Sequence, residues 1–141
     1  MLLILIVLLQ MVLFHDGAES ASMKETAAKT EKLDSGLVRI TLTPQAAERL
    51  DIQTAKVREG EVKGSESKQK KIIPYAAVLY NKNGEAWAYI STEPLVFMRH
   101  PIIIERIDRD DAILTEGPPV DTKVVITGVA ELNGTEEGLG K

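Results

Sequence analysis

The residues that could do chemistry are few and scattered along the chain. His15 and His100 are the two histidines, and His15 lies beside an apolar N-terminal run. Two histidines so far apart do not form a metal site. The chain has no cysteine, which excludes disulfides, thiolate metal ligands and a cysteine nucleophile. We therefore expect neither a metal nor a cofactor.

Acidic residues do form a cluster, at Asp108, Asp110 and Asp111. The cluster falls on a predicted hairpin tip, where aspartate favours turn geometry rather than acid–base work. No glycine pattern has the spacing of a phosphate-binding loop, and no serine sits in a nucleophile elbow. The formal charge of −4 is spread along the chain and offers no basic surface for nucleic acid. The sequence predicts a protein that is neither an enzyme nor a nucleic-acid binder.

The N-terminal run, residues 1–14, is apolar except for Gln10. As a helix it would be ~21 Å long, shorter than the ~30 Å hydrocarbon core of a membrane. That length is typical of a signal peptide, and Ala18 and Ser20 are small residues suited to a cleavage site. No basic residue precedes the run, so a retained anchor or a buried core helix stays open. We expect residues 1–20 to be a signal peptide or membrane anchor.

The elements that would position any site begin after a polar stretch, residues 21–36, which we interpret as a flexible spacer. Alternation of Val38, Ile40 and Leu42 with polar residues predicts a half-buried strand. Thr43 and Pro44 are suited to the cap and first position of a short helix. A second strand is expected to end at Val57. The run "REGEVKGSESKQKK", residues 58–71, is almost wholly polar and predicts a solvent-exposed linker.

The second half of the chain reads as strands separated by Gly- and Pro-containing turns. Asn83 and Gly84 predict a hairpin that brings Val78 and Tyr80 opposite Trp87 and Tyr89. A strand interrupted by Pro101 suits an edge or a bulge. Two further strands follow, and residues 129–141 are expected to be irregular. The pattern predicts a mainly β protein, a small antiparallel β roll or barrel with one short helix, formed by residues 37–141.

Several of these features, taken together, resemble a known family. The stretches "IPYAAVLYNKNGEAWAYI", "PLVFMRHPIIIERID" and "AILTEGPPVDTKVVITGVAELNGTEEG" are similar in order and spacing to the C-terminal part of periplasmic adaptor subunits, or membrane fusion proteins. These adaptors belong to tripartite efflux systems of the resistance-nodulation-division class. The stretch "VRITLTPQAAERLDIQTAKV" is similar to the segment with which they enter their folded region.

The resemblance implies a membrane-proximal β roll built from the first and last folded segments. It also implies that a full adaptor inserts a β-barrel, a lipoyl-like domain and a helical hairpin between these segments, where this chain has only residues 58–71. We therefore expect a non-enzymatic periplasmic protein that docks on the inner-membrane transporter or on a full-length adaptor, with anchoring to the inner membrane left open. Five residues are candidate partner contacts: Asn83, Trp87, Arg99, His100 and Asp110.

Two alternatives remain at this point. The chain could be a degenerate adaptor fragment that folds but has no partner. It could also be a periplasmic metal-binding module, by analogy with metal-exporting adaptors, although its sparse histidines and methionines oppose this.

Overall fold

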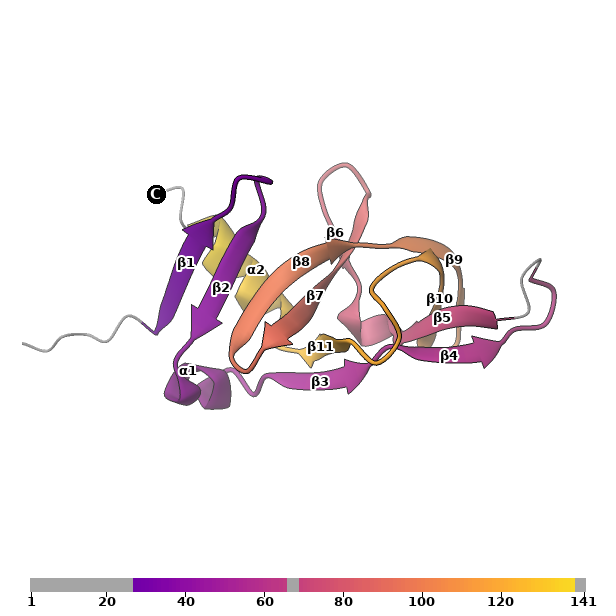
Figure 1. Cartoon of the computed structure of the whole chain (residues 1–141), viewed down its shortest axis with the longest axis horizontal. Helices are drawn as coiled ribbons and strands as arrows, with labels where there is room; N and C mark the ends of the chain where they lie inside the picture. Colours follow the sequence, from indigo (N-terminus) through magenta and orange to yellow (C-terminus); the bar gives the residue numbers. More distant parts are fainter. Residues whose placement is uncertain (1–26, 66–68, 139–141) are drawn as a thin grey trace, which may run out of the picture.

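The computed structural model describes residues 27–65 and 69–138. Within these ranges the protein is mainly β, with antiparallel strands arranged in two sheets (Figure 1). The apolar N-terminal run and most of the expected spacer lie outside the described residues, so the prediction of a signal peptide or anchor is not addressed.

The larger sheet has seven strands in the order β1-β2-β8-β7-β11-β3, with β6 paired to β7. Its strands are β1 (Ala28–Lys32), β2 (Val38–Leu42), β3 (Gln53–Lys56), β6 (Leu79–Tyr80), β7 (Ala86–Glu93), β8 (Val96–Pro101) and β11 (Lys123–Thr127). The smaller sheet has four strands in the order β4-β5-β10-β9. They are β4 (Arg58–Glu61), β5 (Gln69–Pro74), β9 (Ile103–Asp108) and β10 (Asp111–Glu116). The helices are α1 (Pro44–Arg49) and α2 (Val129–Glu137), with a 3-10 turn at Tyr75–Ala77.

The two halves of the chain interleave in the larger sheet. From the N-terminal half, β2 pairs with β8 and β3 pairs with β11, both antiparallel. Val57 lies between β3 and β4, where the chain leaves the larger sheet and enters the smaller one. Neither half could therefore complete the larger sheet without the other.

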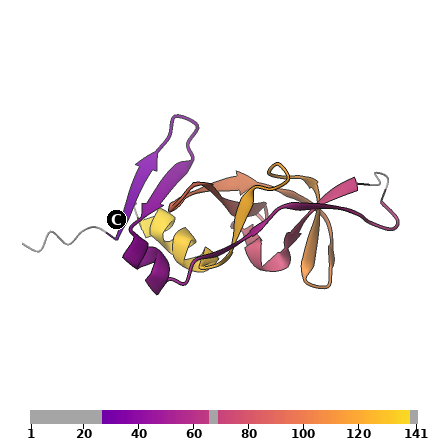
Figure 2. The same ribbon diagram turned by 60° about the horizontal axis from the view of Figure 1, so that its bottom comes forward.

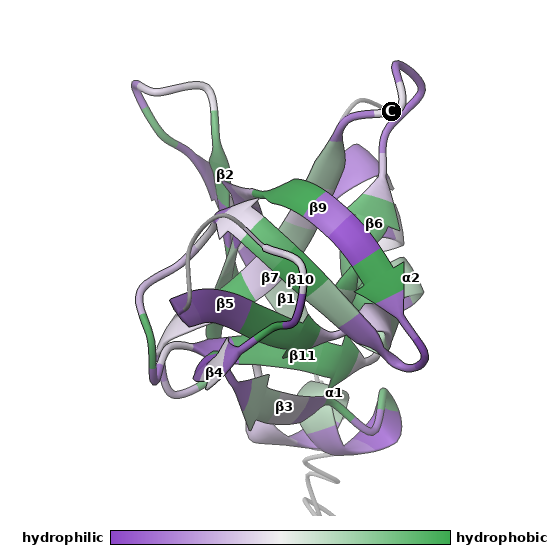
Figure 3. Cartoon of the chain, turned by 90° about the vertical axis from the view of Figure 1, so that its right-hand side faces the viewer, coloured by the Kyte–Doolittle hydropathy of each residue, from purple (hydrophilic) through white to green (hydrophobic). Residues whose placement is uncertain are grey.

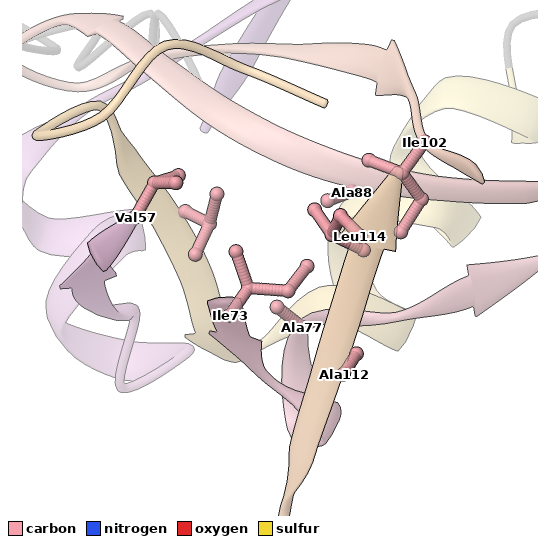
Figure 4. Packing of buried hydrophobic residues seen from close by; sticks show 8 residues of the cluster. Val57, Ile73, Ala77, Ala88, Ile102, Ala112 and Leu114 are labelled. Carbon is pink, nitrogen blue, oxygen red and sulfur yellow. The ribbon is translucent and has the colours of Figure 1, made fainter. Parts of the chain in front are cut away.

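A core shared by both sheets fills the space between them (Figure 4). Val57, Ile73 and Val124 are fully buried there, and Leu114 is nearly so. Ile73 and Leu114 come from the smaller sheet, whereas Val124 comes from the larger one. The remaining members include three alanines, at positions 77, 88 and 112, which let the sheets approach closely.

A second core lies beneath the other end of the larger sheet and is covered by the two helices (Figure 2). Ile40 and Leu42 of β2 are buried, as the alternation predicted. Helix α1 begins as expected, because the Thr43 hydroxyl accepts a hydrogen bond of 3.1 Å from the Ala46 amide and Pro44 occupies the first turn.

Residues 58–71 are exposed or half-buried where the structure describes them, as expected, but they are not an unstructured linker. Arg58–Glu61 form β4 and pair with the start of β5, so the polar run folds into a two-stranded ribbon. The Arg58 guanidinium also forms an ion pair with Asp111. Ribbon strands at a sheet edge need few apolar residues, because backbone pairing rather than burial holds them. Composition alone therefore suggested a loop.

The C-terminal tail is not irregular, because residues 129–137 form α2. Leu132 and Glu136 lie one turn apart on the helix and both are buried, while most of the other helix residues face solvent. A single apolar residue per turn gives too weak a periodic signal to predict a helix. Gly128 precedes the helix with φ +89°, where an added Cβ would meet Ile52 at 2.3 Å.

Two local predictions also need correction. Residues 28–32 of the expected spacer form β1, which pairs with β2 along its whole length. The Asn83-Gly84 hairpin is present, but its register places Leu79 opposite Trp87 and Tyr80 opposite Ala86. The loop at residues 81–85 is longer than a two-residue turn, which shifts the register. Val78 is not part of the strand, because it closes the 3-10 turn, where its amide donates to the Tyr75 carbonyl oxygen at 3.0 Å.

Because one core joins the two sheets, we expect them to unfold together. Replacing fully buried Ile73 in Ile73→Ala should lower the free energy of unfolding by about 2–5 kcal/mol. The control Ile107→Ala removes a side chain that is 41% exposed, and it should cost less than about 1 kcal/mol. Urea unfolding followed by tryptophan fluorescence and by circular dichroism measures both. Two separate transitions would contradict a shared core.

Candidate partner-binding surface

The β6–β7 hairpin projects a rigid loop from the larger sheet. The Asn81 side-chain oxygen accepts hydrogen bonds of 2.9 Å from the backbone amides of Asn83 and Glu85. Gly84 has φ +79°, which glycine adopts without strain. The hairpin tip is therefore shaped by Asn81, and Asn83 stands exposed on it.

A groove of about 740 Å³ lies between the base of this hairpin and the bend that joins β8 to β9. The hairpin wall is Tyr80, Gly84, Glu85, Ala86 and Trp87, and the opposite wall is Pro101, Ile102, Ile103 and Ile104. Glu85 supplies the charge among these lining residues, so the groove is largely apolar. Pro101 ends β8 beyond the part that pairs with β2, which agrees with its predicted place at an edge.

Large apolar side chains are exposed around the groove. Tyr80 is 49% exposed and Ile103 is 51% exposed, and Tyr75 and Ile107 are also exposed. Partial burial and then the neighbouring Tyr75 phenol raise the pKa of Tyr80. Figure 3 shows β9 on the outside of this end of the molecule, with apolar segments on either side of a polar stretch. Exposed apolar side chains grouped in this way are typical of an interaction surface.

Trp87 lines the groove and also contacts Arg99, a residue of the neighbouring strand β8. Its side chain lines the groove, and the Arg99 guanidinium carbon lies 5.0 Å from the centre of its ring, a cation–π contact. The indole N–H is buried and has no hydrogen-bond partner among the described residues. The ring is therefore held by stacking and packing rather than by a hydrogen bond.

Behind Trp87 lies a buried polar cluster made of Tyr89, Arg99 and Glu136, which we call the Glu136 cluster. One carboxylate oxygen of Glu136 accepts a hydrogen bond of 2.6 Å from the Tyr89 hydroxyl. The other lies 2.8 Å from the Arg99 guanidinium. The Glu136 side chain is only 6% exposed, so its charge is compensated almost wholly by these two partners. The cluster ties α2 to β7 and β8 and holds Arg99 over Trp87.

The environment of the cluster changes the acidity of Tyr89. Burial, and then the hydrogen bond to the Glu136 carboxylate, raise the pKa of the Tyr89 hydroxyl well above its ordinary value. The hydroxyl thus stays protonated and remains a donor across the physiological range.

The five predicted contact residues do not form one site. Trp87 and Arg99 are in contact, and His100 follows Arg99 on β8 with its Nδ1 atom 2.8 Å from the Pro101 carbonyl oxygen. Asn83 is at the hairpin tip. Asp110 lies at the β9–β10 turn, where its carbonyl oxygen accepts a hydrogen bond of 2.7 Å from the Tyr75 amide.

The five predicted contact residues do not include Tyr80, Ile103 or Glu136, which line this surface or support it. Tyr80 and Ile103 have the residue types of core positions, and their exposure follows from the edges at which β6 and β9 lie. Glu136 belongs to a tail that was expected to be irregular. The spacing of four residues between Leu132 and Glu136 would place both on one face of a helix. It indicates a buried carboxylate only if a helix is already predicted there.

In residues 27–65 and 69–138, no group of three or more His, Cys, Asp or Glu side chains could hold a metal ion. No helix in the same ranges is long and apolar enough to cross a membrane. Neither a protein-family model, nor a curated protein, nor a solved structure matches the chain.

The raised pKa of Tyr89 gives a prediction for alkaline pH. An unfolded tyrosine ionises near pH 10, whereas folded Tyr89 does not, so this stabilising contribution is complete below about pH 10 and is lost above it. The free energy of unfolding should therefore fall by about 1.4 kcal/mol per pH unit above pH 10 because of this residue. Tyr89→Phe should remove that part of the slope, whereas Tyr80→Phe, at a phenol that is 49% exposed, should remove much less of it. Urea unfolding between pH 8 and 11 measures the difference. Equal slopes in the two variants would contradict the burial of Tyr89 against Glu136.

Removing the charge of Glu136 should destabilise the protein, because Arg99 would lose its partner in a partly buried site. We expect Glu136→Gln to lower the free energy of unfolding by roughly 1–3 kcal/mol. The control Glu137→Gln changes the neighbouring, exposed carboxylate and should have an effect within about 0.5 kcal/mol. Thermal unfolding measures both. Tryptophan fluorescence should change in Glu136→Gln alone, since Arg99 is no longer held over Trp87.

Proposed function

We propose that this chain is a non-enzymatic periplasmic component of a tripartite efflux system, and that it docks on the inner-membrane transporter or on a full-length adaptor. In this role it resembles the membrane-proximal part of an adaptor. Without the helical hairpin implied for a full adaptor, the chain would modulate the assembly rather than bridge it to the outer membrane.

The observation that carries the proposal is the interleaving of the two chain halves. The segment that resembles the entry of an adaptor supplies β2, α1 and β3, and the segment that resembles its end supplies β7, β8, β11 and α2. These elements alternate in one sheet, in which β8 lies between β2 and β7, and β11 lies between β7 and β3. A roll built from first and last folded segments is the architecture that the resemblance implies.

The groove beside Trp87 supports docking as the means of action. Its walls are largely apolar and include the exposed side chains of Tyr80 and Ile103, and the Glu136 cluster holds Arg99 against the Trp87 ring before any partner arrives. A rigid aromatic anchor in an apolar depression is typical of residues that contribute most to protein–protein binding. Because Trp87 already packs against Arg99 in the free protein, a partner that binds it would immobilise fewer side chains, which lowers the entropic cost of binding.

Affinity capture from membranes of the native host tests the proposal. The full chain, cross-linked in cells before extraction, should recover a transporter or adaptor subunit that mass spectrometry identifies. Ile103→Arg places a charge in the groove wall and should reduce this recovery roughly tenfold or more. Val120→Arg changes another exposed apolar residue, outside the groove, and should leave recovery unchanged. Recovery of no transporter or adaptor subunit would contradict the proposal and favour a fragment without a partner.

A further inference from the structure

The outer edge of the larger sheet carries a self-complementary strand. β1 pairs with β2 on one side and is the last strand of its sheet, so its other side faces no strand among the described residues (Figure 1). Its sequence is Ala-Lys-Thr-Glu-Lys, from Ala28 to Lys32. An unpaired strand edge presents backbone donors and acceptors that another strand can bind. What could bind there depends on the side chains that the edge displays.

A second copy of β1, antiparallel and centred on Thr30, matches this edge. Thr30 then lies opposite Thr30 of the second copy, Lys29 lies opposite Glu31, and Glu31 lies opposite Lys29. Threonine pairs and opposite-charge pairs are favourable directly across antiparallel strands. Ala28 meets Lys32, which places no like charges opposite each other. The charges of β1 are therefore complementary to those of a second β1 that is related to it by a twofold axis.

The faces of β1 agree with this arrangement. Ala28 and Thr30 line hollows that they share with residues of α2, including Thr135 and Asn133. Lys29 and Glu31 alternate with them and are exposed on the opposite face. Glu31 also lies 3.1 Å from Arg39 of its own chain, and Lys29 has no ion-pair partner in the part of the chain that the structure describes. Lys29 is therefore available to a carboxylate from outside.

The other strand edges are less suited to self-pairing. β9 carries opposite charges at its centre, but its pairing with β10 has two register shifts. Irregular edges of this kind discourage further strand addition. β4 would place Gly60 opposite Glu59, and β3 has a single charged residue, Lys56. By contrast, β1 is in uninterrupted register with β2 over all five residues.

We propose that two copies of this protein associate through β1, antiparallel about Thr30, so that their larger sheets become continuous. The contact is isologous, and it lies at the end of the molecule away from the smaller sheet and β9 (Figure 1). Each copy keeps its groove beside Trp87 open, so the pair presents two such surfaces. This inference does not rest on the identity of the partner proposed above.

Disulfide trapping tests the register directly, because the natural chain has no cysteine. Cβ atoms directly opposite in antiparallel strands are about 4.5–5.5 Å apart, close to what a disulfide spans. Under mild oxidation the full-length Thr30→Cys chain should form a covalent dimer at least about tenfold faster than Thr54→Cys. The latter places an exposed thiol on β3, at the other edge of the same sheet. Equal rates in the two variants would overturn the proposal.

Charge exchange tests the pairing of Lys29 with Glu31 on the Thr30→Cys background. Glu31→Lys gives each copy two positive charges on this face, and Lys29→Glu gives each copy two negative charges. Either variant alone should form covalent dimer roughly tenfold more slowly, because like charges then lie opposite each other. Mixing the two should restore the rate, with dimers that contain one chain of each kind. Glu48→Lys, an equal charge change on exposed α1, should have no effect. Unchanged rates in both single variants, or no recovery on mixing, would overturn the proposed register.

Discussion

Burial of one small apolar core between the two sheets is the interaction on which the rest of the structure depends. Its members are aliphatic or alanine, and they come from segments as distant as Val57 and Val124. A two-stranded hairpin is marginally stable in water, and stability requires more strands with an apolar face to bury. The smaller sheet buries Ile73 and Leu114 against residues of the larger sheet, among them Ala88 and Val124. The shared core thus fixes how the smaller sheet lies against the larger one, and Ile102 of this core is also part of the groove wall.

The electrostatic arrangement adds a second constraint to the apolar one. A carboxylate as buried as that of Glu136 is costly unless it is paired, and its two partners come from neighbouring strands, β7 and β8. Helix α2 can thus dock in one orientation only, with Leu132 in the second core and Glu136 between Tyr89 and Arg99. The same contact decides where the Arg99 guanidinium lies and therefore immobilises Trp87. A residue of the C-terminal helix thus helps to position Trp87, a side chain that lines the groove.

Much of the fold could be predicted from the sequence, because its signals are local. The alternation at Val38, Ile40 and Leu42, the Thr43 cap and the Asn83-Gly84 turn each act within a few residues, and each is found in the structure. Elements held mainly by distant contacts were missed. Helix α2 depends on a carboxylate that binds residues 47 and 37 positions earlier in the chain, Tyr89 and Arg99. The groove was predicted only in part. Trp87 was among the candidate contacts, but Ile103 was not, because its exposure depends on β9 being the last strand of the smaller sheet.

The ribbon of β4 and β5 shows how the two halves can be joined without an inserted domain. A flexible connection of about a dozen residues would cost only a few kcal/mol to close. This chain instead uses the connection as structure. The Ser65 hydroxyl and the Lys70 ammonium both bind Glu105, and the Arg106 guanidinium donates to the Lys63 carbonyl oxygen at 2.6 Å. These contacts tie the ribbon to β9, so the polar run gives the smaller sheet its outer strand and braces the strand that forms one wall of the groove. The polar run at residues 58–71 does not enter the core, but it still influences the shape of the surface around the groove. It does so because it binds Glu105 and Arg106, two charged residues of β9.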